Sequence, residues 1–222
     1  MPFFEPLPEL PPEPEGQAET SWSPPLWDRP SPGTFPAVVG VSQLFARGEN
    51  LALALDHLYV YPNGFQLIIA ILTSPRLPPE LQMGGFHTMG VLAAQTKPAD
   101  GDKKTPSKPV PSVRPMGRGM LSMGPRIGVQ FANGQHAGAR PESPFDIPKD
   151  EAGIPTEPVI MGGGGGGGGG RYRSEHWVFP LPSPGPLTVF AEWLAAGIEE
   201  ASIVISGDDI RDAAGRAVVL WS

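Results

Sequence analysis

Two neighbouring runs of the chain carry apolar residues at every second position, which is the pattern of a β-strand with one buried face. The positions are Leu51, Leu53 and Leu55 in the first run and Phe65, Leu67, Ile69 and Ile71 in the second. Asn63-Gly64 lies between the runs, and this dipeptide between alternating runs is the strongest short-range signal of a β-hairpin. The pattern therefore predicts a hairpin whose strands cover about 51–61 and 65–73.

A second hairpin is predicted nearer the C-terminal end. Apolar residues alternate at Trp177, Phe179 and Leu181, and again at Leu187, Val189, Ala191 and Trp193. The sequence Ser-Pro-Gly-Pro at 183–186 lies between the two runs and combines residue types that are typical of turns. We expect aromatic side chains to pair across these two strands.

Shorter apolar segments predict further strands, and one segment predicts a helix. The strand segments lie near 38–44, 127–135, 159–161 and 200–206. Ser206 followed by Asp209 is typical of a helix N-terminus, because the hydroxyl caps a backbone N–H and the acid suits the helix dipole. We expect a helix over 207–217 that buries Ile210, Ala213, Ala214 and Ala217.

The predicted fold is mainly β: an antiparallel β-sandwich or barrel-like domain with one short C-terminal helix and long disordered or irregular segments. Tight hairpins without alternating strands and helices favour antiparallel sheets. We divide the chain into a proline-rich acidic arm at 1–36 and a single β-rich domain at 37–222. An irregular insertion at 74–125 and a glycine-rich loop at 162–170 interrupt this domain.

Composition sets the arm and the insertion apart from the domain. Residues 1–36 hold 11 prolines and a net charge of −5, out of −7 for the whole chain, so we expect an extended arm. Its aromatic residues predict docking onto this domain or onto a partner; they are Phe3, Phe4, Trp22, Trp27 and Phe35. The insertion holds four of the five lysines and five of the seven methionines, and methionine suits adaptable binding surfaces.

Several classes of protein are excluded. The chain has no cysteine, which rules out disulfide scaffolds, thiol catalysis, iron–sulfur clusters and cysteine-type zinc sites. The start lacks the pattern of a secretory leader, and the longest apolar run, 67–72, is too short to span a bilayer. A nearly neutral body does not suit nucleic-acid binding. We therefore expect a cytoplasmic protein that binds neither nucleic acid nor membrane.

Four motifs resemble those of a family of uncharacterised actinobacterial proteins. They are YPNGF at 61–65, GVQFANG at 128–134, the strand pair at 176–193 that follows a glycine run, and DIRDAAGR at 209–216. The resemblance covers 37–73 and 126–222 and leaves out the insertion. It implies no activity, cofactor or catalytic residue for this chain.

The residues that carry chemistry form no catalytic or metal motif. The glycines at 162–170 lack the Lys-Ser/Thr and the following helix of a phosphate-binding loop, although Arg171 and Arg173 after them are suited to hold an anion. The four histidines have no metal-ligand spacing; they are His57, His87, His136 and His176. We assign no catalytic residue, no metal site and no cofactor.

Our leading hypothesis is a non-catalytic interaction or structural module that binds a protein partner through the arm or the methionine- and lysine-rich insertion. One alternative is a small enzyme. Its site would assemble from Asp56, His57 and Glu192, or from the loops around His136 and His176, because paired carboxylates and histidines supply general acid and base groups.

A second alternative is a carbohydrate-binding module that stacks a sugar on Trp177 or Trp193. Stacking needs an accessible aromatic face. This hypothesis therefore requires that one of the two rings be more than half exposed.

Overall fold

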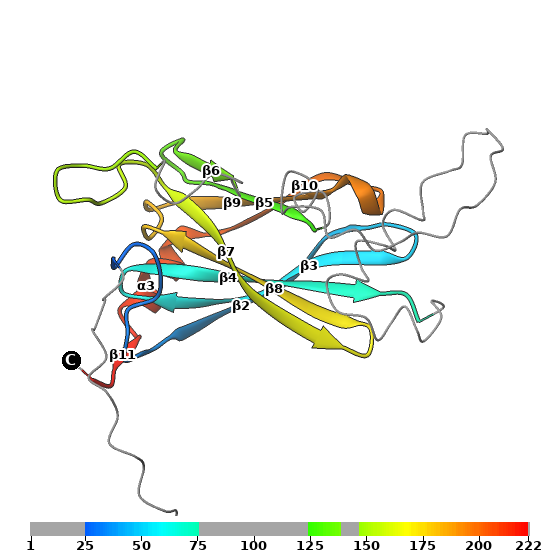
Figure 1. The fold of residues 1–222 in the computed structure, drawn as a ribbon, viewed down its shortest axis with the longest axis horizontal. Coiled ribbons are helices and arrows are strands. Elements are labelled where there is room, and N and C mark those ends of the chain that lie inside the picture. The colour runs from blue at the N-terminus through cyan, green and yellow to red at the C-terminus, as the bar shows by residue number, and fades with distance from the viewer. Residues whose placement is uncertain (1–24, 76–123, 139–146, 222) are drawn as a thin grey trace, which may run out of the picture.

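A five-stranded antiparallel sheet is the largest element of the fold (Figure 1). The computed structural model describes residues 25–75, 124–138 and 147–221. The strand order of this larger sheet is β2–β3–β4–β8–β7. Its strands are β2 (Ala37–Arg47), β3 (Leu51–Tyr61), β4 (Gly64–Thr73), β7 (Val159–Gly168) and β8 (Arg171–Phe179).

A smaller antiparallel sheet packs on one face of the larger sheet and lies above it in Figure 1. Its order is β10–β9–β5–β6. The strands are β5 (Arg126–Gln130), β6 (His136–Gly138), β9 (Pro186–Trp193) and β10 (Ile198–Ser206). The remaining elements are η3 (Leu194–Ala196), α3 (Gly207–Ala214) and a two-stranded ribbon of β1 (Thr34–Phe35) and β11 (Val218–Val219).

One hydrophobic core fills the space between the two sheets. Alternate residues of each strand face inward, as expected of a sandwich. They include Leu53, Leu55, Leu58, Phe65, Leu67, Ile69 and Ile71 from the larger sheet and Ile127, Val129, Leu187, Val189 and Trp193 from the smaller one. The edge strands β2 and β10 lie against each other on one side, and β6 lies near β7 on the other. The predicted mainly β, antiparallel fold is confirmed, as an open sandwich and not a closed barrel.

The second predicted hairpin, of Trp177–Leu181 with Leu187–Trp193, is wrong. β8 pairs with β4 on one side and β7 on the other, so it has no free edge for β9. β9 instead pairs with β5 and β10 in the smaller sheet. The turn at 183–186 therefore carries the chain from one sheet to the other, and the expected aromatic pairs across these two strands do not form.

The first predicted hairpin is confirmed, but its turn differs from the one expected. Tyr61 pairs with Gly64, so Pro62 and Asn63 are the two turn residues. Proline at the first central position suits a type I turn. Gly64 belongs to β4, where an added Cβ would lie 2.5 Å from the carbonyl oxygen of Val178. Gly64 is therefore required by a close contact between strands, not by the turn.

The predicted loop at 162–170 is wrong for most of its length. Residues Gly162–Gly168 belong to β7: Gly162 and Gly165–Gly168 pair with β8, a β-bulge lies between Gly162 and Gly165, and only Gly169 and Gly170 turn the chain. Val159, Ile160 and Met161 start the register, and the backbone hydrogen bonds of a strand need no side chains to continue it. Glycine has a low propensity for strands, and pairing with β8 overrides this propensity here.

The predicted C-terminal helix is confirmed at its start and shorter at its end. The Ser206 hydroxyl accepts a hydrogen bond from the Asp209 backbone N–H at 3.1 Å, as expected of a cap. The helix ends at Ala214, before Gly215, and buries Ile210 and Ala213. No helix in the described ranges is long and apolar enough to cross a membrane.

The fold begins before the boundary that we placed at residue 36. Thr34 and Phe35 pair with Val219 and Val218, and the segment from residue 25 onward packs on the sandwich, as shown below. The rest of the arm, 1–24, lies outside the described residues. So does nearly all of the insertion, together with His87.

We predict that Gly64→Ala destabilises the fold by about 1–3 kcal/mol, because the new methyl group would overlap the backbone of β8 and the Trp177 ring. Gly40→Ala is the matched control, since a Cβ at Gly40 meets nothing within 4 Å. The control should leave stability within about 0.5 kcal/mol. Urea unfolding at equilibrium measures both, and equal midpoints for the two variants would contradict the prediction.

Candidate functional site

A short segment, residues 25–33, crosses the turn between β3 and β4; we call it the strap. The Asn63 side chain holds it with four hydrogen bonds. Nδ2 donates to the carbonyls of Leu26 and Arg29, the second at 2.9 Å. Oδ1 accepts from the backbone N–H of Ser31 at 3.1 Å and from its hydroxyl at 2.8 Å. These four bonds use the full hydrogen-bonding capacity of the amide.

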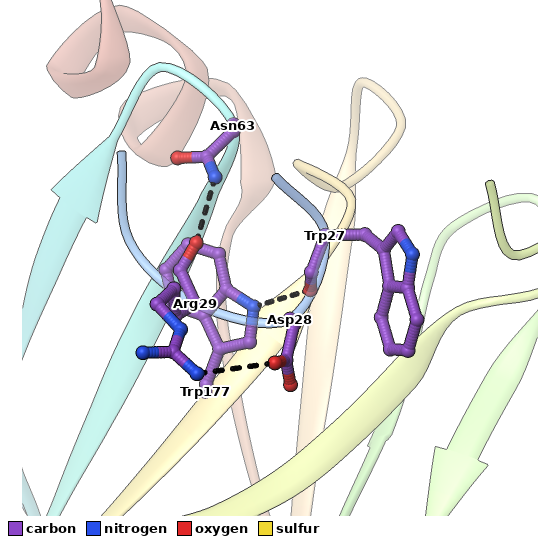
Figure 2. A network of polar contacts seen from close by, with 5 residues as sticks. All are labelled: Trp27, Asp28, Arg29, Asn63 and Trp177. Atoms are coloured by element: carbon purple, nitrogen blue, oxygen red, sulfur yellow. Dashed lines mark hydrogen bonds and ion pairs between the residues drawn. The ribbon is translucent and has the colours of Figure 1, made fainter. Parts of the chain in front are cut away.

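Trp177 is the second anchor of the strap. Its indole N–H donates to the Trp27 carbonyl at 2.8 Å (Figure 2). The Tyr61 ring meets the Trp177 ring edge-on, with centroids 5.9 Å apart, and burial, with smaller effects of Tyr59 and Glu175, raises the pKa of Tyr61. Proteins commonly hold proline-containing segments with aromatic side chains that pack against the segment and donate a hydrogen bond from their polar end.

The Trp27 side chain points away from Trp177 (Figure 2). It is buried, and the Lys149 ammonium lies 4.9 Å from its ring centroid, a favourable cation–π distance. The predicted docking of the arm's aromatic residues is therefore confirmed for Trp27, and its site is this domain. Phe35 remains exposed, and Phe3, Phe4 and Trp22 lie outside the described residues.

A cavity of about 430 Å³ lies beside the strap, where the sandwich opens between β6 and β7. Its volume is in the range of small-molecule sites. Most of the wall is apolar and includes Pro30, Ile147, Pro148, Pro158, Met161 and Trp177. The strap thus forms one wall of the cavity, and the first half of β7 forms another.

Few polar groups border this cavity. They are Asp28, Arg29, Gln66 and Glu157. Arg29 Nη2 lies 3.3 Å from Asp28 Oδ2, and Gln66 Nε2 donates to Glu175 Oε2 at 2.8 Å. An apolar wall with a few polar groups at fixed positions is suited to bind and orient a ligand. The set contains no nucleophile paired with a base.

The face of the larger sheet that points away from the smaller sheet, the outer face, carries a charged cluster. Asp56 Oδ2 lies 3.1 Å from Arg171 Nη2, 4.0 Å from Arg173 Nη2 and 3.6 Å from His57 Nδ1. The arginines come from β8 and reach over β4, where Ala70 leaves room. The anion that Arg171 and Arg173 hold is thus a carboxylate of this chain.

The glycine part of β7 forms a strand edge without side chains. A glycine inside a strand costs roughly 0.5–1 kcal/mol relative to alanine. A Cβ at Gly162, Gly166 or Gly168 would meet nothing within 4 Å, whereas a Cβ at Gly167 would lie 2.2 Å from the Arg171 carbonyl oxygen. Packing therefore requires glycine at Gly167 but not at these three positions. Glycine in a strand often marks a place where another backbone approaches closely.

Ser174 and His176 form a buried polar pair on β8. The Ser174 hydroxyl lies 2.8 Å from His176 Nε2, while Nδ1 has no hydrogen-bond partner among the described residues. Burial lowers the pKa of His176 to about 4. Serine and histidine at this distance resemble a nucleophile and its base, but neither residue lines the cavity. We assign the pair a structural role.

The structure does not assemble the first predicted enzyme site. Asp56 and His57 lie on the outer face of the larger sheet. Glu192 is on β9, where its neighbours Ala191 and Trp193 face the core, so its side chain is on the far face of the smaller sheet. The hypothesis that these three residues meet is wrong, because strand alternation directs them to opposite faces of the sandwich.

The second predicted enzyme site is also not assembled. His176 is buried on the inward face of β8. His136 is exposed on β6, opposite Gln130, and thus lies on the far face of the smaller sheet. No group of three or more metal-ligating side chains gathers among the residues that the structure describes.

Neither tryptophan is available as a sugar platform. Trp177 is 4% exposed and Trp193 is 2% exposed, so the expectation that one ring is more than half exposed is wrong. The two rings lie in different places: Trp193 fills the core between the sheets, and Trp177 lies beneath the strap.

A groove on the far face of the smaller sheet does bring two of the predicted residues together. It has a volume of about 440 Å³ and is lined by Glu192 and His136, with Arg126, Gln130, Phe190 and Glu200. Arg126 Nη1 lies 2.6 Å from Glu192 Oε1; this is an ion pair without hydrogen-bond alignment, since Oε1 has no hydrogen-bond partner. The groove thus combines planar polar groups with one aromatic ring.

Sequence reasoning missed the residues that hold the strap and line the cavity. Asn63 was assigned only to a turn, and Arg29, Gln66 and Met161 were assigned no role. The one signal in the sequence was the set of aromatic residues in the arm, which predicted that a segment containing Trp27 docks onto this domain or a partner. The cavity has no sequence signature, since its walls come from strap, sheet and loop residues far apart in the chain.

We predict that, because of His176, the free energy of unfolding decreases as the pH is lowered from 6.5 to 4. In this window the unfolded chain binds a proton that the folded chain does not, so stability falls as the pH falls and levels off below the folded pKa of about 4. The total loss is on the order of 3 kcal/mol. Urea unfolding at a series of pH values should show this loss for the natural chain and a flatter profile for His176→Gln. Parallel profiles for the natural chain and His176→Gln would contradict the prediction.

Comparisons with known proteins do not assign the chain to a family. No family model matches it, and no curated protein or solved structure matches it significantly. The resemblance to a family of uncharacterised actinobacterial proteins therefore stays a prediction, and the function is inferred from the geometry above.

Proposed function

We propose that this chain is a non-catalytic binding module that holds a segment of a protein partner at the opening between β6 and β7. The observation that carries the proposal is the apolar cavity beside Trp177. Its volume suits one or two large apolar side chains, and the polar groups at its border suit the backbone of a bound segment. The strap already shows that this surface holds a proline-containing segment.

The separation of the catalytic candidates also supports binding over catalysis. Asp56, Glu192 and His176 lie on three different faces of the two sheets, so neither of the two enzyme sites that the sequence suggested is assembled. An enzyme site needs such groups within hydrogen-bond reach of one reacting atom.

A second surface supports an interaction module. The β1–β11 ribbon and the two residues after it expose large apolar side chains: Phe35, Val218, Val219, Leu220 and Trp221. Contiguous exposed apolar residues of this kind mark interaction sites in many proteins.

The proposal keeps three parts of the original hypothesis. The partner is a protein, the module works in the cytoplasm, where a chain without cysteine needs no oxidising environment, and the acidic arm and the insertion contribute to binding. Residues 1–24 and 76–123 lie outside the described residues, so the third part rests on their composition alone.

We predict that filling the cavity abolishes partner binding without loss of fold. Gly162 lines the cavity, and a Cβ there meets no atom within 4 Å, so Gly162→Leu should occupy the space at little cost. The test places a photo-crosslinking amino acid at Met161 of the full chain and exposes the protein to a lysate of the native host. The amount of partner peptide captured should be at least tenfold lower with Gly162→Leu than without it.

Two controls complete this experiment. The same photo-crosslinker at Val204, an exposed position on β10, should capture no specific partner. Gly40→Leu, which adds the same side chain to an edge strand away from the cavity, should leave capture at Met161 unchanged. Equal capture in the Gly162→Leu and Gly40→Leu backgrounds would contradict a partner site in the cavity.

A second candidate function is the binding of a neutral oligosaccharide in the groove of the smaller sheet. Planar side chains such as those of Arg126, Glu192 and Gln130 form paired hydrogen bonds with neighbouring hydroxyls, and the half-buried Phe190 ring offers an apolar face. This places the sugar site on a different surface from the tryptophans that the sequence suggested.

We predict that Phe190→Ala and Glu192→Gln each weaken oligosaccharide binding about tenfold if this groove is used, since each removes one of the two contact types. Titration calorimetry with a panel of neutral oligosaccharides measures the affinity. Met161→Ala serves as the control, because it lies in the cavity on the other side of β6. No heat with any sugar of the panel would remove this candidate.

A further inference from the structure

The ribbon of β1 and β11, together with the two residues after it, exposes five large apolar side chains. Each of them is more than half exposed: Phe35, Val218, Val219, Leu220 and Trp221. The pairing of β1 with β11 places them beside one another, and the backbone N–H groups of Leu220 and Trp221 donate to the Gly33 carbonyl. The five residues therefore form one contiguous surface, which we call the ribbon patch. Figure 1 shows the ribbon at one end of β2.

The ribbon carries apolar side chains on both of its faces. Phe35 and Val218 are directly opposite each other and point to one face. Val219 points to the other face, because successive side chains of a strand alternate. A ribbon that packed on the core of its own domain would bury one face. Within the described ranges neither face of this ribbon is buried.

Charge indicates which partner suits the ribbon patch. No residue is charged from Gly33 to Pro36 or from Ala217 to Trp221. Interfaces with transient partners are about as polar as the rest of a protein surface, whereas interfaces between identical subunits are more apolar. In a dimer with two-fold symmetry the same patch of each copy faces the other, so a charged patch would bring like charges together. The ribbon patch has no charge that would repel its copy.

The patch is also large enough for a dimer. Trp221 is 74% exposed and Phe35 is 64% exposed, and a large aromatic side chain has roughly 150–250 Å² of surface. With the two valines and Leu220 the patch exposes on the order of 600 Å² per copy, and two copies together exceed the roughly 1,000 Å² of a specific interface. An apolar patch of this size is at the upper limit of what monomeric proteins expose.

We propose that the ribbon patch joins two copies of this chain in a dimer with two-fold symmetry. Each copy packs its apolar side chains on those of the other, which removes them from water. None of the five residues lines the cavity between β6 and β7, so the cavities of both copies stay open. The inference goes beyond the proposed function, since a dimer presents two cavities to one partner and thereby increases the avidity of binding.

Sedimentation equilibrium of the full chain, over a range of protein concentrations, tests the proposal. The natural chain should sediment as a dimer. Val219→Glu and Trp221→Lys should each raise the dissociation constant about a hundredfold or more, because like charges would then face each other in an apolar interface. Both side chains are exposed in the single chain, so the circular dichroism spectrum should stay that of the natural fold.

Val204→Glu is the matched control, since it adds the same charge to the same type of residue. Val204 is 60% exposed and lies on β10, outside the ribbon. The control should sediment as the natural chain does. Equal dissociation constants for Val204→Glu and Val219→Glu would overturn the proposal.

Single cysteines locate the interface, because the natural chain has no cysteine. A short bifunctional maleimide should link two copies of the Val219→Cys chain and should leave the Val204→Cys chain unlinked. A monofunctional thiol reagent should modify the Val219→Cys chain more slowly as the protein concentration rises, because the interface then covers the thiol.

Three other outcomes identify a different cover for the patch and overturn the proposal. A monomer whose thiol at position 219 reacts slowly at every concentration would show that another segment of this chain covers the patch. A monomer whose thiol reacts fast would show a patch open to a different protein. A monomer that sediments with phosphatidylcholine vesicles, and loses this property in Trp221→Lys, would show a lipid surface. Partner capture at Met161 by a monomer would leave the proposed function intact.

Discussion

The pairing of β4 with β8 is the interaction on which the rest of this structure depends. It joins two segments about a hundred residues apart and makes β8 an interior strand of the larger sheet. β8 then carries Trp177, which anchors the strap, and pairs with the glycines of β7, which would not form a strand alone. Gly64 makes this pairing possible, because any side chain there would meet the backbone of β8.

The same arrangement is the basis on which we propose binding and not catalysis. Each strand directs alternate residues to opposite faces, so the polar groups of this chain are divided among the outer face, the core and the far face of the smaller sheet. At the open side of the sandwich the walls are apolar, and the adjacent edge is bare backbone.

Local patterns predicted the elements well and the site poorly. The hairpin around Asn63 and the cap at Ser206 follow from neighbouring residues, and the structure has both. The predicted hairpin across 183–186 failed, because β4 and β7 occupy both edges of β8 and β9 pairs within the other sheet. The enzyme hypotheses failed for a reason that the alternation of apolar residues explains. This alternation predicts that Asp56 and Glu192 lie on a surface, but it does not predict on which side of the molecule that surface lies. The glycine run failed for a related reason, since its conformation is imposed by β8 and not by glycine itself.

The sequence by itself determined the mainly β class, the positions of most strands and the helix, and the absence of cysteine chemistry, because these depend on composition and on contacts between near neighbours. Only the tertiary structure decided that Asn63 fastens the strap, that Trp177 is buried and that Arg171 and Arg173 share Asp56. These contacts join residues 32 to 150 positions apart. They arise from the order and register of strands within each sheet, and no local pattern records that order.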